Sequence, residues 1–476
     1  MSAQTKHRQV AIIGGGPGGY AAAFLAADLG LEVTVIDPKQ NPGGICLYHG
    51  CIPSKTLLNA ARLIHEAADA EQFGVRFAKP KIDIAKLRAW KDDVVRSLTE
   101  GLGRLTQQRN ITHIRGHAEF AGPQTLDITP AEGQPYELTF EHAIVATGSY
   151  PVMLPGLPQD SPLILDSSGA LAIKDVPSSL LIVGGGYIGL ELGTVYATLG
   201  AKVTIAEITP GLLPGADRDL VTVLKRRLTS LFEEIALNTE AADFKVQKNG
   251  VKVTLKGPEG DSTSRLFSKI LVAVGRRPNS RNIGLQKAGV AVDARGFIKV
   301  DRQCRTNIDN IFAIGDVAGE PMLAHKASHQ GRLAAEVIAG SKQVFEPAAI
   351  PAVVFTDPEV AWAGMTEQMA RDAGIAHQVV RFPWAASGRA TTIGRTDGLT
   401  KLIIQADTER ILGIGMVGAG AGEMIAEGVL AIEMGANAVD LKMTIHPHPT
   451  LTETVMEAAE LFFGTATHFY RKQRKK

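Results

Sequence analysis

Two stretches of the chain repeat one order of apolar and polar positions. In the first, an apolar run at residues 10–13 precedes a glycine turn, an alanine-rich segment and a second apolar run that ends at Asp37. In the second, an apolar run at residues 180–183 precedes the same succession, which ends at Glu207. Short apolar runs bounded by glycine and alternating with helical segments indicate buried parallel strands. The pattern therefore predicts two copies of one β-α-β unit.

The turn of each unit carries three glycines at a spacing typical of dinucleotide-binding folds, and the acid lies eighteen residues beyond the third. The glycines are Gly14, Gly16 and Gly19 in the first unit and Gly184, Gly186 and Gly189 in the second. The first glycine permits a tight turn, the second lets the backbone approach a pyrophosphate, and the third allows close helix packing. The helix N-terminus then faces the phosphates. Two complete units predict two dinucleotide sites.

The acid that ends each unit can accept the hydroxyl groups of an adenosine ribose. These acids are Asp37 and Glu207. An acid at position 207 repels a 2′-phosphate, and residues 208–210 supply no arginine to bind one. The second site is therefore expected to prefer NAD over NADP.

Three further apolar runs indicate buried strands that end in glycine, at residues 143–147, 271–274 and 311–314. From about residue 350 the pattern changes to short strands and amphipathic helices, which is typical of an α+β domain. We therefore expect an α/β protein with two Rossmann-like dinucleotide-binding domains and an α+β C-terminal domain. The expected domains span residues 1–149, 150–277, 278–347 and 348–476, and the third completes the first.

Composition narrows the class of protein. The 476 residues are 45% hydrophobic and 21% charged, with a net charge of +1, so no nucleic-acid or membrane surface is expected. Three cysteines are too few for a disulfide-stabilised secreted scaffold. Residues 1–9 show no apolar leader, and no run is long enough to span a membrane. A cytoplasmic protein is expected, although an organellar protein without its presequence would look the same. The basic tail, residues 471–476, is expected to be a solvated terminus.

Cys46 and Cys51 are five residues apart, just after the first unit. On an ideal helix this spacing turns the side chains about 140° apart, so a bridge between them requires a loosened first turn. Gly50 and Pro53 fit such an irregular start, and a helix N-terminus stabilises a thiolate. Two thiols beside a bound dinucleotide suggest a redox pair.

Rival interpretations of these thiols are two buried free thiols or half of a metal site. Cys304 offers no paired spacing for zinc, and we expect no metal. His49 is interpreted as a partly exposed loop residue. Lys55 lies four residues after Cys51, on the same helical face, and Glu191 is a possible partner for it.

His448 is followed five residues later by Glu453. A neutral imidazole can take a thiol proton near pH 7, and a carboxylate behind it fixes the tautomer. Because a dithiol mechanism needs a proton acceptor, we prefer this interpretation to loop histidines with ordinary helix capping. Thr452 is expected to cap a helix that starts near Glu453. The Pro449 that follows the histidine makes a cis His448–Pro449 bond a hypothesis.

The sequence resembles the FAD-dependent pyridine nucleotide–disulfide oxidoreductases, from Val10 to about Phe463. The most specific motifs are the cysteine block at residues 46–55, the Gly315-Asp316 pair and the block at residues 446–453. Within the family, the resemblance is greatest to members that oxidise dihydrolipoyl groups with NAD.

The resemblance implies FAD on the first turn, NAD on the second and a homodimer formed through the C-terminal domain. The implied FAD residues are Gly14, Gly16, Gly19, Asp37, Lys55, Thr147, Gly148, Gly315 and Asp316. The implied NAD residues are Gly184, Gly186, Gly189, Glu207 and Gly275. The implied catalytic residues are Cys46, Cys51, Lys55, Glu191, His448 and Glu453.

The family also implies individual roles. Cys46 would exchange with the substrate and Cys51 would contact the flavin, with Lys55 near the flavin ring. His448 would face Cys46 of the other subunit. No lipoyl domain is expected before Val10, so the lipoyl group would arrive on an acyltransferase or carrier protein of a multienzyme complex.

Other functions stay open within and beyond the family. A glutathione-reductase-like enzyme would prefer NADPH, against which Glu207 argues. A mercuric reductase would carry more cysteines near its end, and a transhydrogenase would lack Cys46. A flavoprotein that serves mainly as a docking subunit is the rival from another class. Tyr48, His49 and Pro447 depart from the residues that relatives usually carry, which bears on substrate access.

Overall fold

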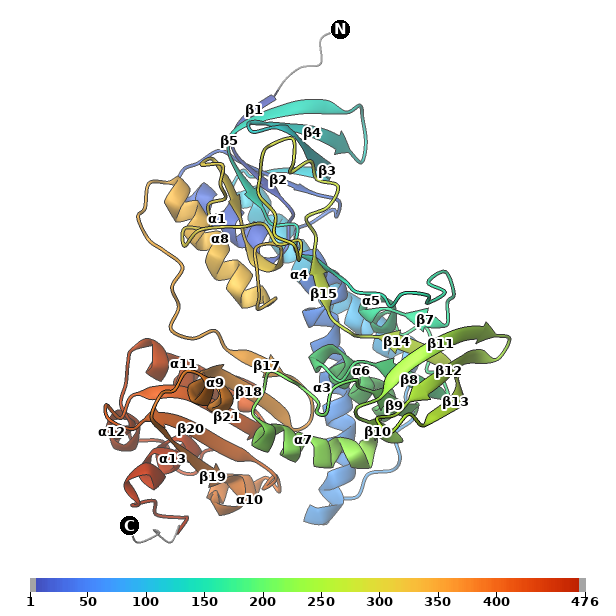
Figure 1. The fold of residues 1–476 in the computed structure, drawn as a ribbon, viewed down its shortest axis with the longest axis vertical. Helices are drawn as coiled ribbons and strands as arrows, with labels where there is room; N and C mark the ends of the chain where they lie inside the picture. The colour runs from blue at the N-terminus through green and yellow to red at the C-terminus, as the bar shows by residue number, and fades with distance from the viewer. Residues whose placement is uncertain (1–5, 471–476) are drawn as a thin grey trace.

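The computed structural model describes residues 6–470, which form three sheet-containing regions in succession (Figure 1). The basic tail at residues 471–476 lies outside the described residues. No helix within residues 6–470 has both the length and the apolar character needed to cross a lipid bilayer.

The first sheet has six strands in the spatial order β1-β2-β3-β4-β5-β16, and β1 also pairs with β5. β1 is parallel to β2 and β5, and β5 is parallel to β16, whereas β4 is antiparallel to both of its neighbours. The strands are β1 (Lys6–Ile13), β2 (Val33–Asp37), β3 (Thr112–Gly122), β4 (Thr125–Pro130), β5 (Tyr136–Val145) and β16 (Ile311–Ala313).

Helices α1 (Pro17–Asp28) and α8 (Ala324–Ile338) pack against each other beside this sheet (Figure 1). Their backbones approach closely because both helices carry glycine at the crossing. A Cβ added to Gly331 would lie 2.3 Å from the carbonyl oxygen of Gly18. The buried residues of α1 are all small: Gly18, Gly19, Ala22, Ala23 and Ala26.

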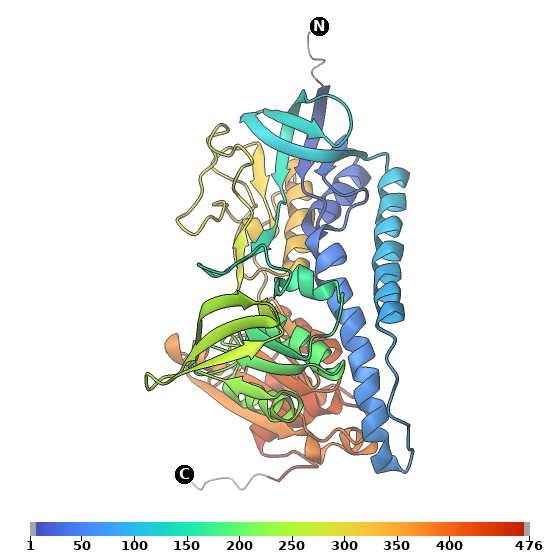
Figure 2. The same ribbon diagram turned by 90° about the vertical axis from the view of Figure 1, so that its right-hand side faces the viewer.

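Three more helices follow the first unit: α2 (Gly44–His49), α3 (Cys51–Asp69) and α4 (Ile84–Gln108). Figure 2 shows α3 running from the first region down past the second and third. The helix is amphipathic, with Leu57, Leu58 and Ala61 buried, and it packs against α4 and α6 (Tyr187–Thr198). A short 3₁₀ turn, η1 (Ala70–Phe73), ends it.

The second sheet is wholly parallel, in the order β10-β9-β8-β14-β7. An antiparallel meander, β11-β12-β13, accompanies it. The elements are β7 (Ile164–Leu165), α5 (Ser167–Leu171), β8 (Ser179–Val183), β9 (Lys202–Ala206), α7 (Arg218–Leu231), β10 (Glu234–Ala236), β11 (Glu240–Gln247), β12 (Gly250–Lys256), β13 (Ser262–Phe267) and β14 (Lys269–Val272). Both predicted β-α-β units are therefore present, as β1-α1-β2 and β8-α6-β9.

A two-stranded ribbon of β6 (Ser149–Pro151) and β15 (Arg276–Pro278) joins the first two regions. The chain then returns to the first sheet through β16, and the 3₁₀ turn η2 (Gly315–Val317) follows.

The third region is an antiparallel sheet in the order β17-β18-β21-β20-β19, so the predicted α+β C-terminal region is confirmed. Its elements are β17 (Ala352–Val354), β18 (Glu359–Gly364), α9 (Glu367–Asp372), β19 (His377–Pro383), η3 (Trp384–Ala386), α10 (Gly388–Thr392), β20 (Leu399–Gln405), β21 (Ile411–Gly418), α11 (Ala421–Glu433), α12 (Ala438–Met443) and α13 (Glu453–Phe463).

A buried ion cluster attaches this third region to the second. The ammonium of Lys401, 1% exposed, lies 2.9 Å from Asp217, 3.0 Å from Asp219 and 2.8 Å from Glu367. Arg381 contacts two of the same carboxylates. Because each buried charge has partners, the cluster avoids the cost of uncompensated burial.

Candidate functional site

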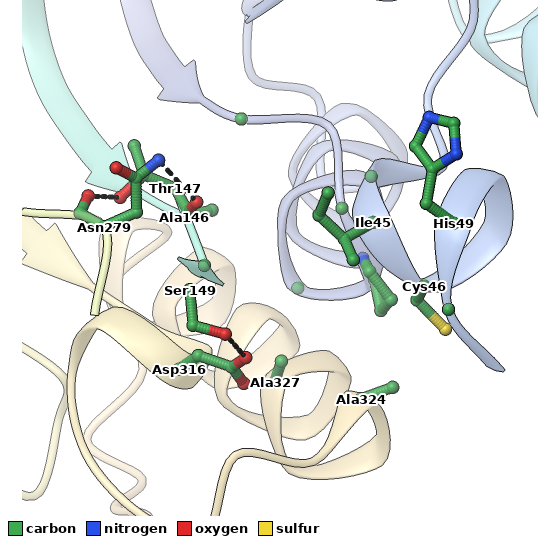
Figure 3. Close-up of a pocket in the computed structure, with 18 of the residues that line it drawn as sticks. Ile45, Cys46, His49, Ala146, Thr147, Ser149, Asn279, Asp316, Ala324 and Ala327 are labelled. Atoms are coloured by element: carbon green, nitrogen blue, oxygen red, sulfur yellow. Dashed lines mark hydrogen bonds between the residues drawn. The ribbon is translucent and has the colours of Figure 1, made fainter. Parts of the chain in front are cut away.

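A cavity of about 410 Å³ lies where the ends of β1, β5 and β16 meet α2 and α3 (Figure 3). Most of the candidate residues line it, although they come from distant segments of the chain. Those that line it are Gly14, Gly16, Asp37, Cys46, Cys51, Lys55, Thr147, Gly148, Glu191, Gly315 and Asp316. Gly19 supports the turn from behind, because a Cβ there would lie 1.9 Å from the carbonyl oxygen of Gly14.

The first glycine turn is fixed by its own acid. Gly14 has φ +105°, in the region that favours glycine, and its backbone N–H bonds to Ile36. Asp37 accepts the N–H of Gly15 at 2.7 Å and that of Lys39 at 2.8 Å. The carboxylate is thus oriented at the mouth of the turn, and its oxygens keep lone pairs for a ribose.

The second glycine turn repeats these contacts. Gly184 has φ +112°, and Glu207 accepts the N–H of Gly185 at 2.5 Å and that of Thr209 at 2.8 Å. This turn and Gly275 belong to the second sheet and are not among the residues that line the large cavity. The duplication seen in the sequence therefore extends to the hydrogen bonds of the turn.

Both turns fit an adenine dinucleotide. The space where a side chain would stand at Gly186 holds no atom within 4 Å, and at Gly16 the nearest atom is 3.8 Å away. Helices α1 and α6 start directly after these glycines, with no acidic residue in the first turn. An open backbone at a helix N-terminus suits a pyrophosphate.

The end of β16 contributes a polar group to the cavity. Ser149 donates a hydrogen bond to Asp316 at 2.5 Å (Figure 3). Arg276 in turn donates to the Ser149 hydroxyl at 2.7 Å. Beside them, the Thr147 hydroxyl donates to the carbonyl of Asn279 at 2.7 Å. These contacts hold the carboxylate of Asp316 in the cavity wall.

Cys46 and Cys51 are free thiols, Cys46 in α2 and Cys51 at the first position of α3. Gly50, with φ −144° and ψ −115°, breaks the helix between them, so the predicted loosened turn is confirmed. A hydrogen bond from Cys46 lowers the pKa of Cys51 to about 7, with help from Lys55 and against burial. The same bond and burial raise the pKa of Cys46. The pair therefore ionises first at Cys51, as a thiolate at a helix N-terminus.

Lys55 and Glu191 form the predicted pair, with Nζ 2.8 Å from one carboxylate oxygen and 3.1 Å from the other. Glu191 is 3% exposed, so its charge needs this partner. The third region also contacts this pair, because the backbone N–H of Phe355 donates a hydrogen bond to Glu191 at 3.0 Å. The Lys55 ammonium also lies 4.6 Å from the centre of the Phe355 ring.

His448 and Glu453 are paired at 2.9 Å through Nδ1, and the His448–Pro449 bond is cis, as expected. The helix starts at Glu453, but the Thr452 side chain does not cap it, so that expectation was wrong. Its hydroxyl bonds to the Thr450 hydroxyl instead, and Glu453 itself accepts the N–H of Thr450 at 2.7 Å.

The structure does not bring His448 to the thiols of its own chain. The thiols line the large cavity, whereas His448 lines a second cavity in the third region, with its side chain 71% exposed. His49 also differs from expectation. It is the last residue of α2 rather than a loop residue, and it is half-buried in the wall of the large cavity (Figure 3).

Several contributors to these sites escaped the sequence analysis: Ser149, Arg276, Asn279, Phe355, Glu457 and His468. Phe355 acts partly through its backbone N–H, which every residue except proline possesses, so no motif marks it. Ser149 and Arg276 stand beside recognised motifs but acquire meaning only through contacts with distant segments.

Comparisons with known proteins agree with this geometry. The sequence pattern of the pyridine nucleotide-disulphide oxidoreductase family matches residues 8–331, and that of its dimerisation domain matches residues 350–459. A dihydrolipoyl dehydrogenase of Vibrio cholerae is 46% identical over the whole length of both chains. A dihydrolipoyl dehydrogenase of Geobacillus stearothermophilus is 45% identical, with 97% of each chain covered.

Solved structures show the same fold. LpdA of Mycobacterium tuberculosis has a TM-score of 0.88 at 28% identity, with 96% of this chain and 99% of that chain covered. The HOCl-induced flavoprotein disulfide reductase RclA of Escherichia coli has a TM-score of 0.84 at 30% identity, with 95% and 99% covered. The two glycine turns and the thiol pair that lies between them in the sequence are found in a chain that matches its relatives over their full length. The chain belongs to the pyridine nucleotide-disulphide oxidoreductase family.

Proposed function

We propose that this protein oxidises dihydrolipoyl groups to lipoyl groups and reduces NAD⁺ to NADH. The observation that carries the proposal is that Cys46 and Cys51 line the same cavity as Gly14, Gly16 and Asp37 of the first glycine turn. The dihydrolipoyl substrate is supported by relatives of that name, which are 44–46% identical over 96% or more of this chain.

The residues that line the large cavity would hold FAD, with Asp37 binding its adenosine ribose, Asp316 its ribityl chain and Lys55 its ring. When bound there, FAD supplies a carrier for the electron pair between the dithiol and the nicotinamide. Thr147, Gly148 and Gly315 lie along the same wall. NAD fits the second turn, with Glu207 at its adenosine ribose.

The thiols carry the exchange with the substrate. His448, oriented by Glu453, takes the proton from one dihydrolipoyl thiol, and the thiolate attacks Sγ of Cys46 in the oxidised pair. The disulfide bond breaks and Cys51 leaves as a thiolate. The second substrate sulfur then attacks the substrate sulfur of the mixed disulfide, which closes the lipoyl ring and releases Cys46. The proton of this second thiol passes to the departing Cys46 sulfur. Lys55 stabilises the Cys51 thiolate, in keeping with its effect on the Cys51 pKa.

A homodimer completes the site. His448 is largely exposed and lines a different cavity from the thiols of its own chain, and the family's dimerisation domain covers residues 350–459. His448 of one subunit therefore serves Cys46 of the other. The lipoyl group arrives on an acyltransferase or lipoyl carrier protein of a multienzyme complex.

NAD is the expected coenzyme because Glu207 would repel a 2′-phosphate. Arg218, the nearest arginine after it in sequence, already donates to the carbonyls of Leu212, Leu213 and Ala216. It is therefore not free to bind a phosphate. This arrangement disfavours a glutathione-reductase-like enzyme that uses NADPH.

The proposal includes the predicted domain boundaries at residues 149, 277 and 347. It also places the protein in a reducing compartment such as the cytoplasm. The return of β16 and α8 to the first sheet supports a central segment that completes the first domain. The sparse cysteines support the compartment.

The test is dihydrolipoamide-dependent reduction of NAD⁺ by the FAD-loaded protein, with NADP⁺ and with glutathione disulfide plus NADPH measured alongside. Fast reduction of NAD⁺ with little NADP⁺ activity is the expected result. An FAD-loaded protein that reduces another disulfide but does not oxidise dihydrolipoamide would contradict the proposal.

A further inference from the structure

The loop that follows the second β-α-β unit, residues 208–216, folds back over the glycine turn of that unit. The backbone N–H of Leu213 donates a hydrogen bond to the carbonyl oxygen of Gly185 at 3.1 Å. Glu207 accepts the N–H of Gly185, so both backbone polar groups of this glycine are bound. Leu212 lies over the same residue, because a Cβ added to Gly185 would be 2.6 Å from its side chain. The 208–216 loop therefore packs directly on the second turn.

The first unit makes the same contact with different residues. The N–H of Gly43 donates to the carbonyl oxygen of Gly15 at 2.7 Å. In each unit the donor stands twenty-eight residues after the acceptor. Gly44, which follows the donor in the first unit, has φ +57°, in the left-handed region that glycine adopts without strain. The first unit thus turns at this place with two glycines.

The second unit turns there with a leucine instead. Leu213 has φ +47°, which is an unfavourable conformation for a residue with a Cβ. Leu213 and Leu212 are also buried, so the loop cannot move away without exposing apolar side chains. A strained backbone of this kind persists only where surrounding contacts hold it.

Arg218, the first residue of α7, makes those contacts. Its guanidinium donates to the carbonyl oxygen of Leu212 at 2.7 Å and to the carbonyl oxygens of Leu213 and Ala216. Its Nε adds a bond to Ala216 at 3.1 Å. A planar guanidinium presents several donors in a fixed arrangement, which suits it to bind several carbonyls at once. The C=O of Leu213 is thus bound by Arg218, and its N–H is bound by Gly185.

The acidic neighbours of Arg218 fix the start of α7. Asp217 and Asp219 bind Lys401, at 2.9 Å and 3.0 Å, in the ion cluster that attaches the third region to the second. The helix start is therefore anchored on the third region, and the guanidinium reaches the 208–216 loop from a fixed position.

We propose that Arg218 is a positioning residue for NAD: by binding the carbonyls of the 208–216 loop, it keeps the second glycine turn in the shape that receives the coenzyme. The hydrogen bonds run from Arg218 to Leu213 and from Leu213 to Gly185, so a loop released by the guanidinium would no longer hold the turn. This inference rests on the proposed NAD site at the second turn, and it does not depend on the identity of the dithiol substrate.

The test compares the full-length, FAD-loaded wild type with Arg218→Met and Arg218→Lys. Methionine keeps an apolar stem without any N–H donor, whereas lysine keeps the charge but lacks the planar fork. The Kd of the oxidised protein for NAD⁺ is measured by isothermal titration calorimetry. Arg218→Met is expected to raise this Kd by about 5- to 20-fold and Arg218→Lys by about 2- to 5-fold.

A second measurement separates positioning from general damage. The anaerobic rate at which dihydrolipoamide reduces the protein should stay within about twofold of the wild-type rate in both variants, because this half of the reaction needs no NAD. The thiols that carry it line the large cavity, to which Arg218 does not contribute. The matched control is Arg226→Met, because Arg226 is exposed on the same helix, and its Kd for NAD⁺ should equal that of the wild type.

A Kd for NAD⁺ that is unchanged in both Arg218 variants would overturn the inference. An equal loss in NAD⁺ binding and in reduction by dihydrolipoamide would also overturn it, as would a similar rise in Kd for Arg226→Met. If Arg218→Met does not fold, Arg218→Lys decides by the same criteria. A wild-type protein that binds NAD⁺ but does not oxidise dihydrolipoamide would refute the proposed function and leave this comparison valid.

Discussion

The backbone N–H of Phe355 donates a hydrogen bond to Glu191 at 3.0 Å, which brings the third region of the molecule to the redox site. Glu191 belongs to α6 of the second region and binds Lys55, on α3 of the first. One carboxylate therefore joins all three regions within reach of the Cys51 thiol. The ion pair that sets the charge around this thiol depends on the packing of the whole chain.

The two members of this ion pair are expected to shift the Cys51 pKa in opposite directions. Lys55 lowers that pKa and Glu191 raises it. Lys55→Gln should therefore raise it, and Glu191→Gln should lower it, each by about half to one unit. The measurement is the pH dependence of alkylation of the reduced protein. Shifts of the same sign in the two variants would contradict the assignment.

The dithiol is expected to be indispensable for substrate oxidation but not for assembly. Cys51→Ser should reduce dihydrolipoamide turnover by at least about 1,000-fold, because the exchange requires both sulfur atoms. Gel filtration and FAD absorbance should match the wild type. Cys304→Ala is the matched control, because Cys304 is buried outside the cavity and its loss should cost only about 1 kcal/mol of stability. Full turnover in Cys51→Ser would exclude a disulfide mechanism.

Mixed dimers test whether the base acts across the interface. Cys51→Ser and His448→Gln should each be inactive alone. After subunit exchange, one of the two sites in a hybrid dimer combines an intact thiol pair with an intact histidine from the other chain. Activity should recover to roughly a quarter of the wild-type value, since half of the dimers are hybrids with one working site. No recovery, with hybrids shown by mass spectrometry, would place the base in the same chain as the thiols.

Asp357 is expected to stabilise the junction of α3, α7 and the third region in a pH-dependent way. Burial alone would raise its pKa, but His65, Arg395 and Arg227 lower it to about 2. A carboxylate with a depressed folded-state pKa stabilises the protein fully above its ordinary value of 3.8, and this contribution is lost as the pH falls toward about 2.

Asp357→Asn should therefore lower stability by about 2 kcal/mol at pH 7, and the difference from wild type should shrink as the pH falls below about 4. Thermal unfolding midpoints measured from neutral to acidic pH check this. A difference that stays constant down to pH 2 would show that the ionised carboxylate is not its source.

The elements that the sequence predicted best are those whose signals are local. Gly14 and its equivalents need a conformation that few other residues adopt, and Asp37 and Glu207 stand at a fixed distance from them. Gly50 likewise predicted the break between the two helices that carry the cysteines. In these cases the residue type alone restricts the backbone.

Contacts between segments that are distant in the sequence could not be predicted from the sequence. Thr452 has the residue type of a helix cap, yet its side chain accepts no N–H from the helix, because the N–H groups of Thr454 and Val455 bond to the backbone carbonyls of Leu451 and Thr452. His468 stands in a segment without a motif and pairs with Glu457 only because the chain reverses at Gly464. Such roles depend on tertiary geometry rather than on spacing.

The double duty of Glu207 has a consequence for the evolution of coenzyme choice. Its carboxylate discriminates against a 2′-phosphate, and the same two oxygens hold the backbone N–H groups of Gly185 and Thr209. A change to alanine would admit the phosphate but leave both donors without their acceptor. A lineage that switched to NADPH would therefore need a paired replacement, one residue that preserves the turn and another that attracts the added charge. Preference for NAD is thus protected by the architecture that makes binding possible.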